Sequence, residues 1–323
     1  MRNVLVVLLI LISCFIFVNG SAFGAESKIL NVDPVKNEIT LWENIPFSEG
    51  IARGVLRYSL TMDVLQPRVK EKSPLIVFVT GGGFIMAPKN NLIQLRMALA
   101  EAGYIVASIE YRVAPLGRFP QPLEDVKTAI RWLRANAEKF NIDPERVGIL
   151  GNSAGGYLSA FTGITSGSKE FDKGENLNFT SDVLCAVDMY GLSDLTVIGA
   201  DFDEANQKGH ASAGATEALW VLGTSTFGGN DGGVLAPENK NLIDKANPIN
   251  YINEKSAPML LMHGDADKLV SPSQTKILFE ALQAKGIESE RYVIPGAAHG
   301  GIYWAQDNVI KTIVEFFDKY MKK

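Results

Sequence analysis

The chain has 323 residues, of which 46% are hydrophobic and 21% charged, and this average composition excludes disordered, collagen-like and low-complexity proteins. A formal net charge of −5 provides no positive field for nucleic acid or anionic lipid, so we expect neither as a partner. The length suffices to bury a large core, so we expect stability without disulfides or metal ions.

Residues 1–24 have the three-part pattern of a secretory signal peptide. Arg2 precedes an uncharged apolar run over residues 4–18, and the small residues Ala22 and Gly24 suit cleavage immediately after them. Because this run is shorter than the roughly 20 residues that span a bilayer, we expect cleavage and no stable membrane span. The mature protein is then expected to be secreted or periplasmic.

The two cysteines bear on the same prediction. Cys14 stands in a loose lipoprotein box, so a lipid-anchored protein is the alternative, which the apolar residues after Cys14 disfavour. Cleavage at the predicted position leaves Cys185 without an intramolecular partner. The apolar neighbours of Cys185, over residues 183–187, predict a small buried side chain.

Short apolar runs alternate with helical patterns from residue 50 onward. This alternation predicts an α/β protein with a mostly parallel, twisted sheet and helices on both faces. Residues 37–65 have strand and turn character without helices, which fits antiparallel strands at a sheet edge. The predicted buried strands cover residues 75–79, 104–109, 147–150, 184–189 and 259–262, and residues 290–294 are predicted as the last strand. The predicted helices cover 123–140, 273–284 and 308–320.

Residues 193–250 interrupt the alternation. They lack strand character, contain a cluster of glycines over residues 223–233, and have one helical pattern at residues 211–222. A segment of this length without core strands is typical of an insertion, here a candidate lid. Because we find no internal repeat or linker, residues 25–323 are predicted to form one domain that carries this insertion.

Residues 151–156 have the sequence GNSAGG, between a predicted strand and a helix-compatible segment at 157–161. Gly-x-Ser-x-Gly in that context is the pattern of a nucleophile elbow. The turn is so sharp that Gly151 and Gly155 must lack side chains, and it holds Ser153 in a strained conformation with its hydroxyl exposed. Ser153 is therefore the candidate nucleophile.

A serine hydroxyl needs a base within hydrogen-bond reach, and the chain has three histidines. His299 lies among small residues between the last predicted strand and helix, where an imidazole can reach the sheet edge, and is the candidate base. His210 falls in the insertion, where we expect a solvated loop residue. His263 ends a predicted strand, where we expect a structural residue of the following turn.

The base in turn needs a carboxylate that fixes its tautomer. Asp265 and Asp267 both follow the predicted strand at 259–262, at the edge where α/β sites collect. The spacing His-Gly-x-x-Asp-x-x-Val favours Asp267, with Asp265 as the alternative acid or, failing that, a cap of the turn. Ser153, Asp267 and His299 occur in the chain order expected after a nucleophile elbow.

Residues 80–84 have the sequence TGGGF and directly follow the predicted strand at 75–79. Bare backbone amides at that edge can stabilise an oxyanion, so the candidate donors are Gly82, Gly83 and Ala154, which follows the nucleophile. A phosphate-binding loop is the alternative for three glycines, but neither Gly-Lys-Ser/Thr nor Gly-x-Gly-x-x-Gly follows.

Five segments occur in the order of an α/β-hydrolase carboxylesterase: TGGGF at 80–84, YRVAP at 111–115, GNSAGG at 151–156, HGDADKLV at 263–270 and AAHGG at 297–301. Over about residues 55–320 the chain resembles the hormone-sensitive-lipase-like group and the bacterial acetyl and feruloyl polysaccharide esterases. Thr80 stands where that group usually has histidine, and Asn152 where an acidic residue is common, which leaves the subgroup open.

The resemblance implies an α/β-hydrolase fold and an acyl-enzyme mechanism in which Ser153 attacks an ester, His299 is the acid/base and Asp267 its partner. It implies no metal or cofactor. We expect a small-molecule or oligosaccharide ester as substrate, with acetyl or feruloyl esters of plant polysaccharides favoured. The aromatic residues predicted as candidates for lining the substrate pocket, or else for the core, are Trp220, Phe227, Tyr303 and Trp304.

Two other functions remain as alternatives. A serine peptidase of the prolyl-oligopeptidase type shares the order of the triad, but residues 25–70 leave no room for the propeller domain that such enzymes usually carry. A non-catalytic binding protein with a hydrolase fold generally loses the nucleophile or the histidine, whereas this chain keeps all three residues of the triad.

Overall fold

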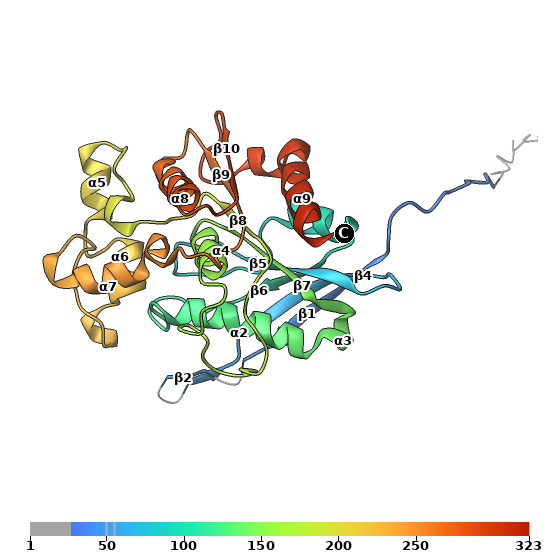
Figure 1. Ribbon diagram of the computed structural model, residues 1–323, viewed down its shortest axis with the longest axis horizontal. Coiled ribbons are helices and arrows are strands. Elements are labelled where there is room, and N and C mark those ends of the chain that lie inside the picture. The colour runs from blue at the N-terminus through green and yellow to red at the C-terminus, as the bar shows by residue number, and fades with distance from the viewer. Residues whose placement is uncertain (1–26, 49–50, 54–55, 323) are drawn as a thin grey trace, which may run out of the picture. The chain divides into compact units, whose positions relative to one another are not determined.

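The computed structural model describes residues 27–48, 51–53 and 56–322 (Figure 1). The predicted signal peptide, including Cys14, lies outside the described residues. The chain from Lys36 onward forms one compact unit, which carries the helices and strands named below. Among the described residues, no helix has the length and apolar character that a membrane crossing requires.

A mixed sheet forms the centre of this unit. Its strands are β1 (Ile39–Pro46), β4 (Thr61–Pro67), β5 (Ser73–Val79), β6 (Ile105–Ile109), β7 (Ile142–Asn152), β8 (Ala186–Met189), β9 (Met259–Gly264) and β10 (Ser289–Ile294). The eight strands lie in the order β1-β4-β6-β5-β7-β8-β9-β10. β1 and β6 flank β4 in antiparallel pairing, and all pairs from β6 to β10 are parallel. β2 (Ile51–Arg53) and β3 (Leu56–Tyr58) form a separate antiparallel pair.

Helices cover both faces of the sheet, as predicted. They are α1 (Ile93–Glu101), α2 (Gln121–Ala135), α3 (Ala137–Phe140), α4 (Ala154–Ile164), α5 (Glu204–His210), α6 (Thr216–Leu222), α7 (Lys240–Ala246), α8 (Ser273–Ala284) and α9 (Asp307–Met321). Leu75, Val77 and Val79 of β5 pack in a core shared with α2, α4 and α8. Ile76 and Phe78 pack in a second core with α1 and α9. β5 is apolar at consecutive positions because both of its faces are buried.

Two helix predictions differ from the structure. The pattern at 123–140 belongs to two helices, α2 and α3, with Asn136 between them. The helix expected at 211–222 is wrong in its first half, because α6 begins only at Thr216. The preceding residues instead follow α5, which buries none of its residues and therefore has no apolar periodicity to detect.

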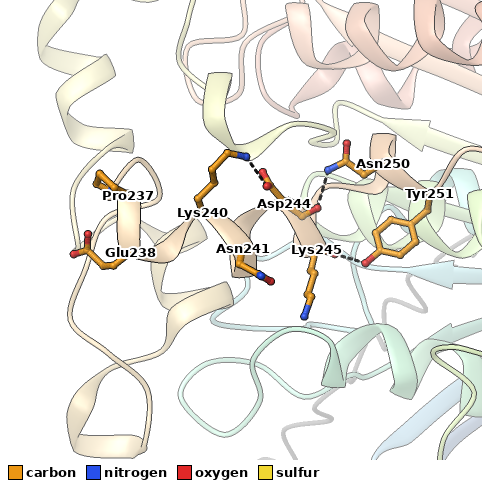
Figure 2. A pocket seen from close by; sticks show the side chains of 8 residues that line it. All are labelled: Pro237, Glu238, Lys240, Asn241, Asp244, Lys245, Asn250 and Tyr251. Atoms are coloured by element: carbon orange, nitrogen blue, oxygen red, sulfur yellow. Dashed lines mark hydrogen bonds and ion pairs between the residues drawn. The ribbon is translucent and has the colours of Figure 1, made fainter.

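The helices α5, α6 and α7 belong to the long connection between β8 and β9. Residues 190–258, all described, contain no strand, in agreement with the sequence pattern. In Figure 1 these helices, coloured yellow to orange, lie together in one group, and Figure 2 shows α7 from close by. Asp203 begins α5 by accepting a hydrogen bond from the amide of Asn206 at 3.0 Å.

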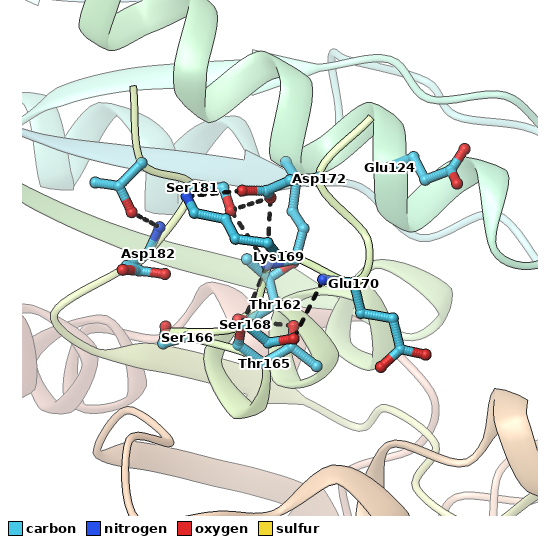
Figure 3. Close-up of polar contacts among 12 residues, drawn as sticks. Glu124, Thr162, Thr165, Ser166, Ser168, Lys169, Glu170, Asp172, Ser181 and Asp182 are labelled. Carbon is cyan, nitrogen blue, oxygen red and sulfur yellow. Dashed lines mark hydrogen bonds and ion pairs between the residues drawn. The ribbon is translucent and has the colours of Figure 1, made fainter. Parts of the chain in front are cut away.

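A buried polar cluster fastens the loop between α4 and β8 to α2 (Figure 3). Asp172 accepts hydrogen bonds from the Ser181 hydroxyl at 2.5 Å and from Arg131 Nη1 at 3.2 Å, and it pairs with Lys169 at 3.0 Å. Lys127 Nζ lies 3.2 Å from Ser181 Oγ, and burial lowers the pKa of Lys127 to about 8. Because these charges are paired with one another, removal of a single partner would leave a buried charge without compensation.

Candidate active site

Ser153 forms the turn between β7 and α4 with φ 54° and ψ −125°, a strained conformation for a residue other than glycine. A Cβ added to Gly151 would lie 2.1 Å from the carbonyl oxygen of Gly155. A Cβ added to Gly155 would lie 2.0 Å from the carbonyl oxygen of Val79. The elbow therefore requires glycine at both positions, as its sequence predicts.

Three side chains from three separate loops form a chain of hydrogen bonds. Ser153 Oγ lies 2.7 Å from His299 Nε2, and His299 Nδ1 lies 2.7 Å from Asp267 Oδ2. An ionised carboxylate can only accept, so Nδ1 carries the hydrogen and Nε2 accepts from the serine hydroxyl. In this tautomer His299 can take the proton of Ser153 as the oxygen attacks a carbonyl carbon.

Asp267 is the anchor of this chain. Its Oδ1 accepts the backbone amides of Leu269 and Val270 at 2.8 and 3.0 Å, and its Oδ2 accepts from His299 and, at 3.2 Å, from His263. Burial opposes ionisation of the 2% exposed Asp267, but these hydrogen bonds outweigh it and hold the pKa of the carboxyl well below its usual range. Asp267 is therefore ionised while His299 accepts the proton of Ser153.

The other acidic candidate has a different place. Asp265 Oδ1 accepts the amide of Gly296 at 2.6 Å, in the loop that leads from β10 to His299. Asp265 therefore supports the loop of the base and does not contact the imidazole of His299 among the hydrogen bonds of the described residues.

His210 is not the solvated loop residue that the sequence suggested. Its Nδ1 lies 2.6 Å from Glu217 Oε1, whose side chain is only 4% exposed. The hydrogen bond to Glu217 raises the pKa of His210, and partial burial opposes that rise. The prediction was wrong because the turn between α5 and α6 brings the two side chains together, a contact without a local sequence signal.

The candidate oxyanion donors lie beside Ser153. The amide of Gly81 donates to Asn152 Oδ1 at 3.0 Å, whereas the amides of Gly82, Gly83 and Ala154 have no acceptor among the described residues. Gly82 and Gly83 also line the pocket at Ser153. Free amides at this position can stabilise the negative charge of a tetrahedral intermediate.

Asn152 connects the glycine loop to the opposite wall of the site. Besides accepting from Gly81, its Nδ2 donates to the Tyr190 hydroxyl at 3.3 Å. The Tyr190 ring meets the His299 ring edge-on, with centroids 4.8 Å apart. Sequence reasoning noted Asn152 only as a departure from a family pattern and missed Tyr190, for which no motif gives a signal.

A pocket of about 400 Å³ opens at Ser153 and His299. Its walls combine apolar side chains with the amide of Asn91 and the hydroxyl-bearing ring of Tyr190. Such a pocket can accept an acyl group next to a polar alcohol portion. The apolar lining residues are Met86, Pro88, Leu92 and Leu269.

Of the four aromatic residues predicted for the pocket or else the core, the three whose side chains are described do not line this pocket. Trp220 is fully buried and stacks on Phe84 with centroids 4.4 Å apart, in the core beneath α6. Trp304 is fully buried and donates to the carbonyl of Ala298 at 3.0 Å. Tyr303 is 44% exposed and does not line the pocket; its hydroxyl lies close to Gly296. The Phe227 side chain lies outside the described part of the structure.

A larger hollow, of about 680 Å³, lies over α7 (Figure 2). Its polar groups bond to one another: Lys240 pairs with Asp244 at 2.5 Å, and the Tyr251 hydroxyl donates to the carbonyl of Lys245 at 2.9 Å. Its lining residues include no serine, cysteine or histidine. The candidate active site is therefore identified by its chemistry and not by the volume of a hollow.

Comparison with curated proteins finds esterases. The chain is 30% identical to Esterase LipC of Mycobacterium tuberculosis over 71% of its length, and 28% identical to the isoprenylcysteine alpha-carbonyl methylesterase ICME of Arabidopsis thaliana over 76%. The matched regions cover 53% and 54% of these two proteins. The chain thus spans about half the length of the curated relatives it matches.

Solved structures and a family profile agree with this similarity. A truncated carbohydrate esterase from gut microbiota superposes with a TM-score of 0.76 and 26% identity, covering 90% of this chain and 99% of the other. A bifunctional GH43-CE protein of Bacteroides eggerthii superposes with a TM-score of 0.74 and 28% identity, over 87% of this chain and 35% of the other. The BD-FAE family profile matches residues 62–282. With its α/β-hydrolase fold and its ordered motifs, the chain therefore belongs to the BD-FAE family.

Proposed function

We propose that the protein is an exported serine carboxylesterase that releases acyl groups, such as acetyl or feruloyl, from carbohydrates. The observation that carries this proposal is the hydrogen-bonded chain Ser153–His299–Asp267 beside free backbone amides. This combination supplies an activated nucleophile and an oxyanion site, the two requirements of acyl transfer.

The geometry supports a two-step mechanism. Ser153 Oγ attacks the ester carbonyl carbon while His299 Nε2 takes its proton, and the amides of Gly82, Gly83 and Ala154 stabilise the oxyanion. His299 then gives the proton to the departing alcohol, which leaves an acyl-enzyme. A water molecule, deprotonated by His299, attacks the acyl carbon; the bond to Ser153 Oγ then breaks, His299 returns the proton to Ser153, and the acid is released.

Carbohydrate esters are supported by the relatives and by the pocket. The gut carbohydrate esterase is matched over nearly its whole length, and the bifunctional GH43-CE protein is matched over 35% of its chain. Apolar walls at Met86 and Leu269 suit an acyl group, and Asn91 and Tyr190 suit hydroxyl groups of the alcohol portion.

Ester hydrolysis is tested with purified wild-type protein, Ser153→Ala and the control Ser159→Ala. Ser159 lies on α4, and its buried hydroxyl has no partner among the described residues, so its loss should leave turnover unchanged. The substrates are chromogenic acetyl to octanoyl esters, methyl ferulate, acetylated xylan and a dipeptidyl amide. We expect ester turnover by wild type and Ser159→Ala, and a loss of about 10⁴-fold or more in Ser153→Ala. Turnover that persists in Ser153→Ala, or that is confined to the amide, overturns the proposal.

Export is supported by the charge and apolar pattern of residues 1–24. Fractionation of expressing cells with N-terminal mass spectrometry tests it. A soluble exported product that begins at Ala25 is the expected result. A product lipidated at Cys14 would establish the lipoprotein alternative, and an uncleaved cytoplasmic chain would refute export.

A further inference from the structure

His263 is a fully buried histidine that contacts Asp267 at Oδ2, the same oxygen that holds His299. Its Nε2 lies 3.2 Å from Asp267 Oδ2 and 3.1 Å from the carbonyl oxygen of Val270. Both of these oxygens only accept, so Nε2 must carry a hydrogen, which it shares between them. The tautomer of His263 is thereby determined by its neighbours.

The second nitrogen of His263 is also engaged. Nδ1 lies 3.2 Å from the hydroxyl oxygen of the buried Thr275, which in turn accepts from Arg291 Nε at 3.2 Å. The hydroxyl hydrogen has two acceptors in reach, Nδ1 and, at 3.4 Å, the carbonyl of Pro272. Nδ1, at 3.2 Å, is the closer of the two, and in the tautomer with its hydrogen on Nε2 it can accept from the hydroxyl. In this tautomer His263 has one donor and one acceptor, and both have partners.

We propose that His263 is a positioning residue of the active site: its Nε2–H fixes the rotation of the Asp267 carboxylate and withdraws negative charge from Oδ2, the oxygen that holds His299. This inference rests on the proposed esterase function. It extends the chain of contacts behind the triad to Thr275 on α8 and Arg291 on β10.

The division of hydrogen bonds on Asp267 explains why His263 matters. Two backbone amides hold Oδ1, whereas two imidazoles share Oδ2, with His299 at 2.7 Å and His263 at 3.2 Å. Loss of His263 leaves Oδ2 with His299 as its one donor. The carboxylate then stabilises protonated His299 more strongly, so a higher pH is needed to free His299 as a base.

The charged and titratable groups around this contact are few. Asp267 faces His263 from the loop after β9, and Arg291 of β10 stands behind Thr275. His299 is faced by Asp267, by the Ser153 hydroxyl and by the edge of the Tyr190 ring. Of these groups, the carboxylate of Asp267 is the charged one in contact with His299, so a change on Oδ2 should be visible in the pH profile.

The test compares His263→Leu with His263→Gln. Leucine removes the donor while filling most of the volume, and the glutamine Nε2 stands as many bonds from Cβ as the imidazole Nε2, so it can still donate. Rates are normalised to active sites titrated to completion with a fluorophosphonate. For His263→Leu we expect kcat to fall on the order of tenfold with little change in KM, and the acidic midpoint of kcat/KM to rise by about 0.5 pH unit. His263→Gln should restore both.

The outcomes separate a positioning role from a structural one. If His263→Leu lowers only the melting temperature, and keeps the kcat per titrated site and the acidic midpoint of wild type, the inference is overturned. Proton NMR provides a second measurement that needs no substrate. The low-field chemical shift of the His299 Nδ1–H proton should differ from wild type in His263→Leu and match wild type in His263→Gln. An immobile resonance overturns the inference, whereas a wild type without ester turnover overturns the proposed function alone.

Discussion

Replacement of Asn152 by leucine removes the acceptor that holds the glycine loop in place. Asn152 Oδ1 accepts the buried amide of Gly81 at 3.0 Å, one residue before the candidate oxyanion donors Gly82 and Gly83. Leucine has a similar volume but no polar atom, so Asn152→Leu leaves the Gly81 amide without its acceptor. The loop should then move until that amide finds water or another oxygen.

The expected size follows from two magnitudes. An unsatisfied buried amide costs about 1–3 kcal/mol, and loss of one oxyanion donor costs about 100- to 1000-fold in kcat. Asn152 acts on Gly82 and Gly83 only through Gly81, so the loss should stay below that of a missing donor. We therefore expect kcat to fall by about 10- to 100-fold, or about 1.4–2.7 kcal/mol. KM should change little because the oxyanion forms only after binding.

Steady-state kinetics with p-nitrophenyl acetate measures this effect, and Asn152→Asp is the matched control. Aspartate keeps an acceptor for Gly81, and its second oxygen can accept from the Tyr190 hydroxyl, which burial keeps protonated by raising the pKa of Tyr190. Its kcat should therefore remain well above that of Asn152→Leu. Wild-type kcat in a correctly folded Asn152→Leu protein would refute the reasoning.

Three further predictions follow from the corrected positions of His210 and the aromatic residues. The hydrogen bond to Glu217 raises the pKa of His210 above its ordinary value of 6.5. The wild-type protein should therefore be more stable than Glu217→Gln by the full amount below pH 6.5, and this advantage should decline as pH rises through the raised pKa. A melting-temperature difference that stays constant from about pH 6 to 9 would contradict this. Trp220→Ala should lower the free energy of unfolding by about 3–5 kcal/mol in urea titrations, since the side chain is fully buried, and a negligible change would place Trp220 outside the core. Tyr303→Ala should leave KM within about twofold of wild type, and a tenfold rise would return Tyr303 to the substrate site.

Much of the fold could be predicted because its signals are local. The strand at 75–79 is apolar at every position since it is buried on both faces, and α8 has the bounds of the predicted helix at 273–284. The amphipathic pattern at 308–320 likewise matches α9. α5 could not be predicted in this way, because a helix without buried residues has no apolar stripe.

The triad residues could also be predicted from the sequence, whereas the contacts that hold the site around them could not. Ser153, Asp267 and His299 stand in motifs whose glycines are required by sterics, such as Gly151 and Gly155. Such a motif can be recognised in the sequence because the geometry of the turn permits only glycine at these positions. The contact between Asn152 and Gly81 joins two motifs that lie 71 positions apart, and neither motif by itself indicates it.

The α/β class, the nucleophile elbow and the order of the triad could therefore be predicted from sequence, because local sterics and periodicity encode them. Three features emerged only in the folded chain: His263 shares Asp267 with His299, His210 pairs with Glu217, and Trp220 belongs to the core. These contacts depend on how loops from distant parts of the chain meet at the sheet edge. That packing is a property of the whole folded chain, and no short segment of sequence contains it.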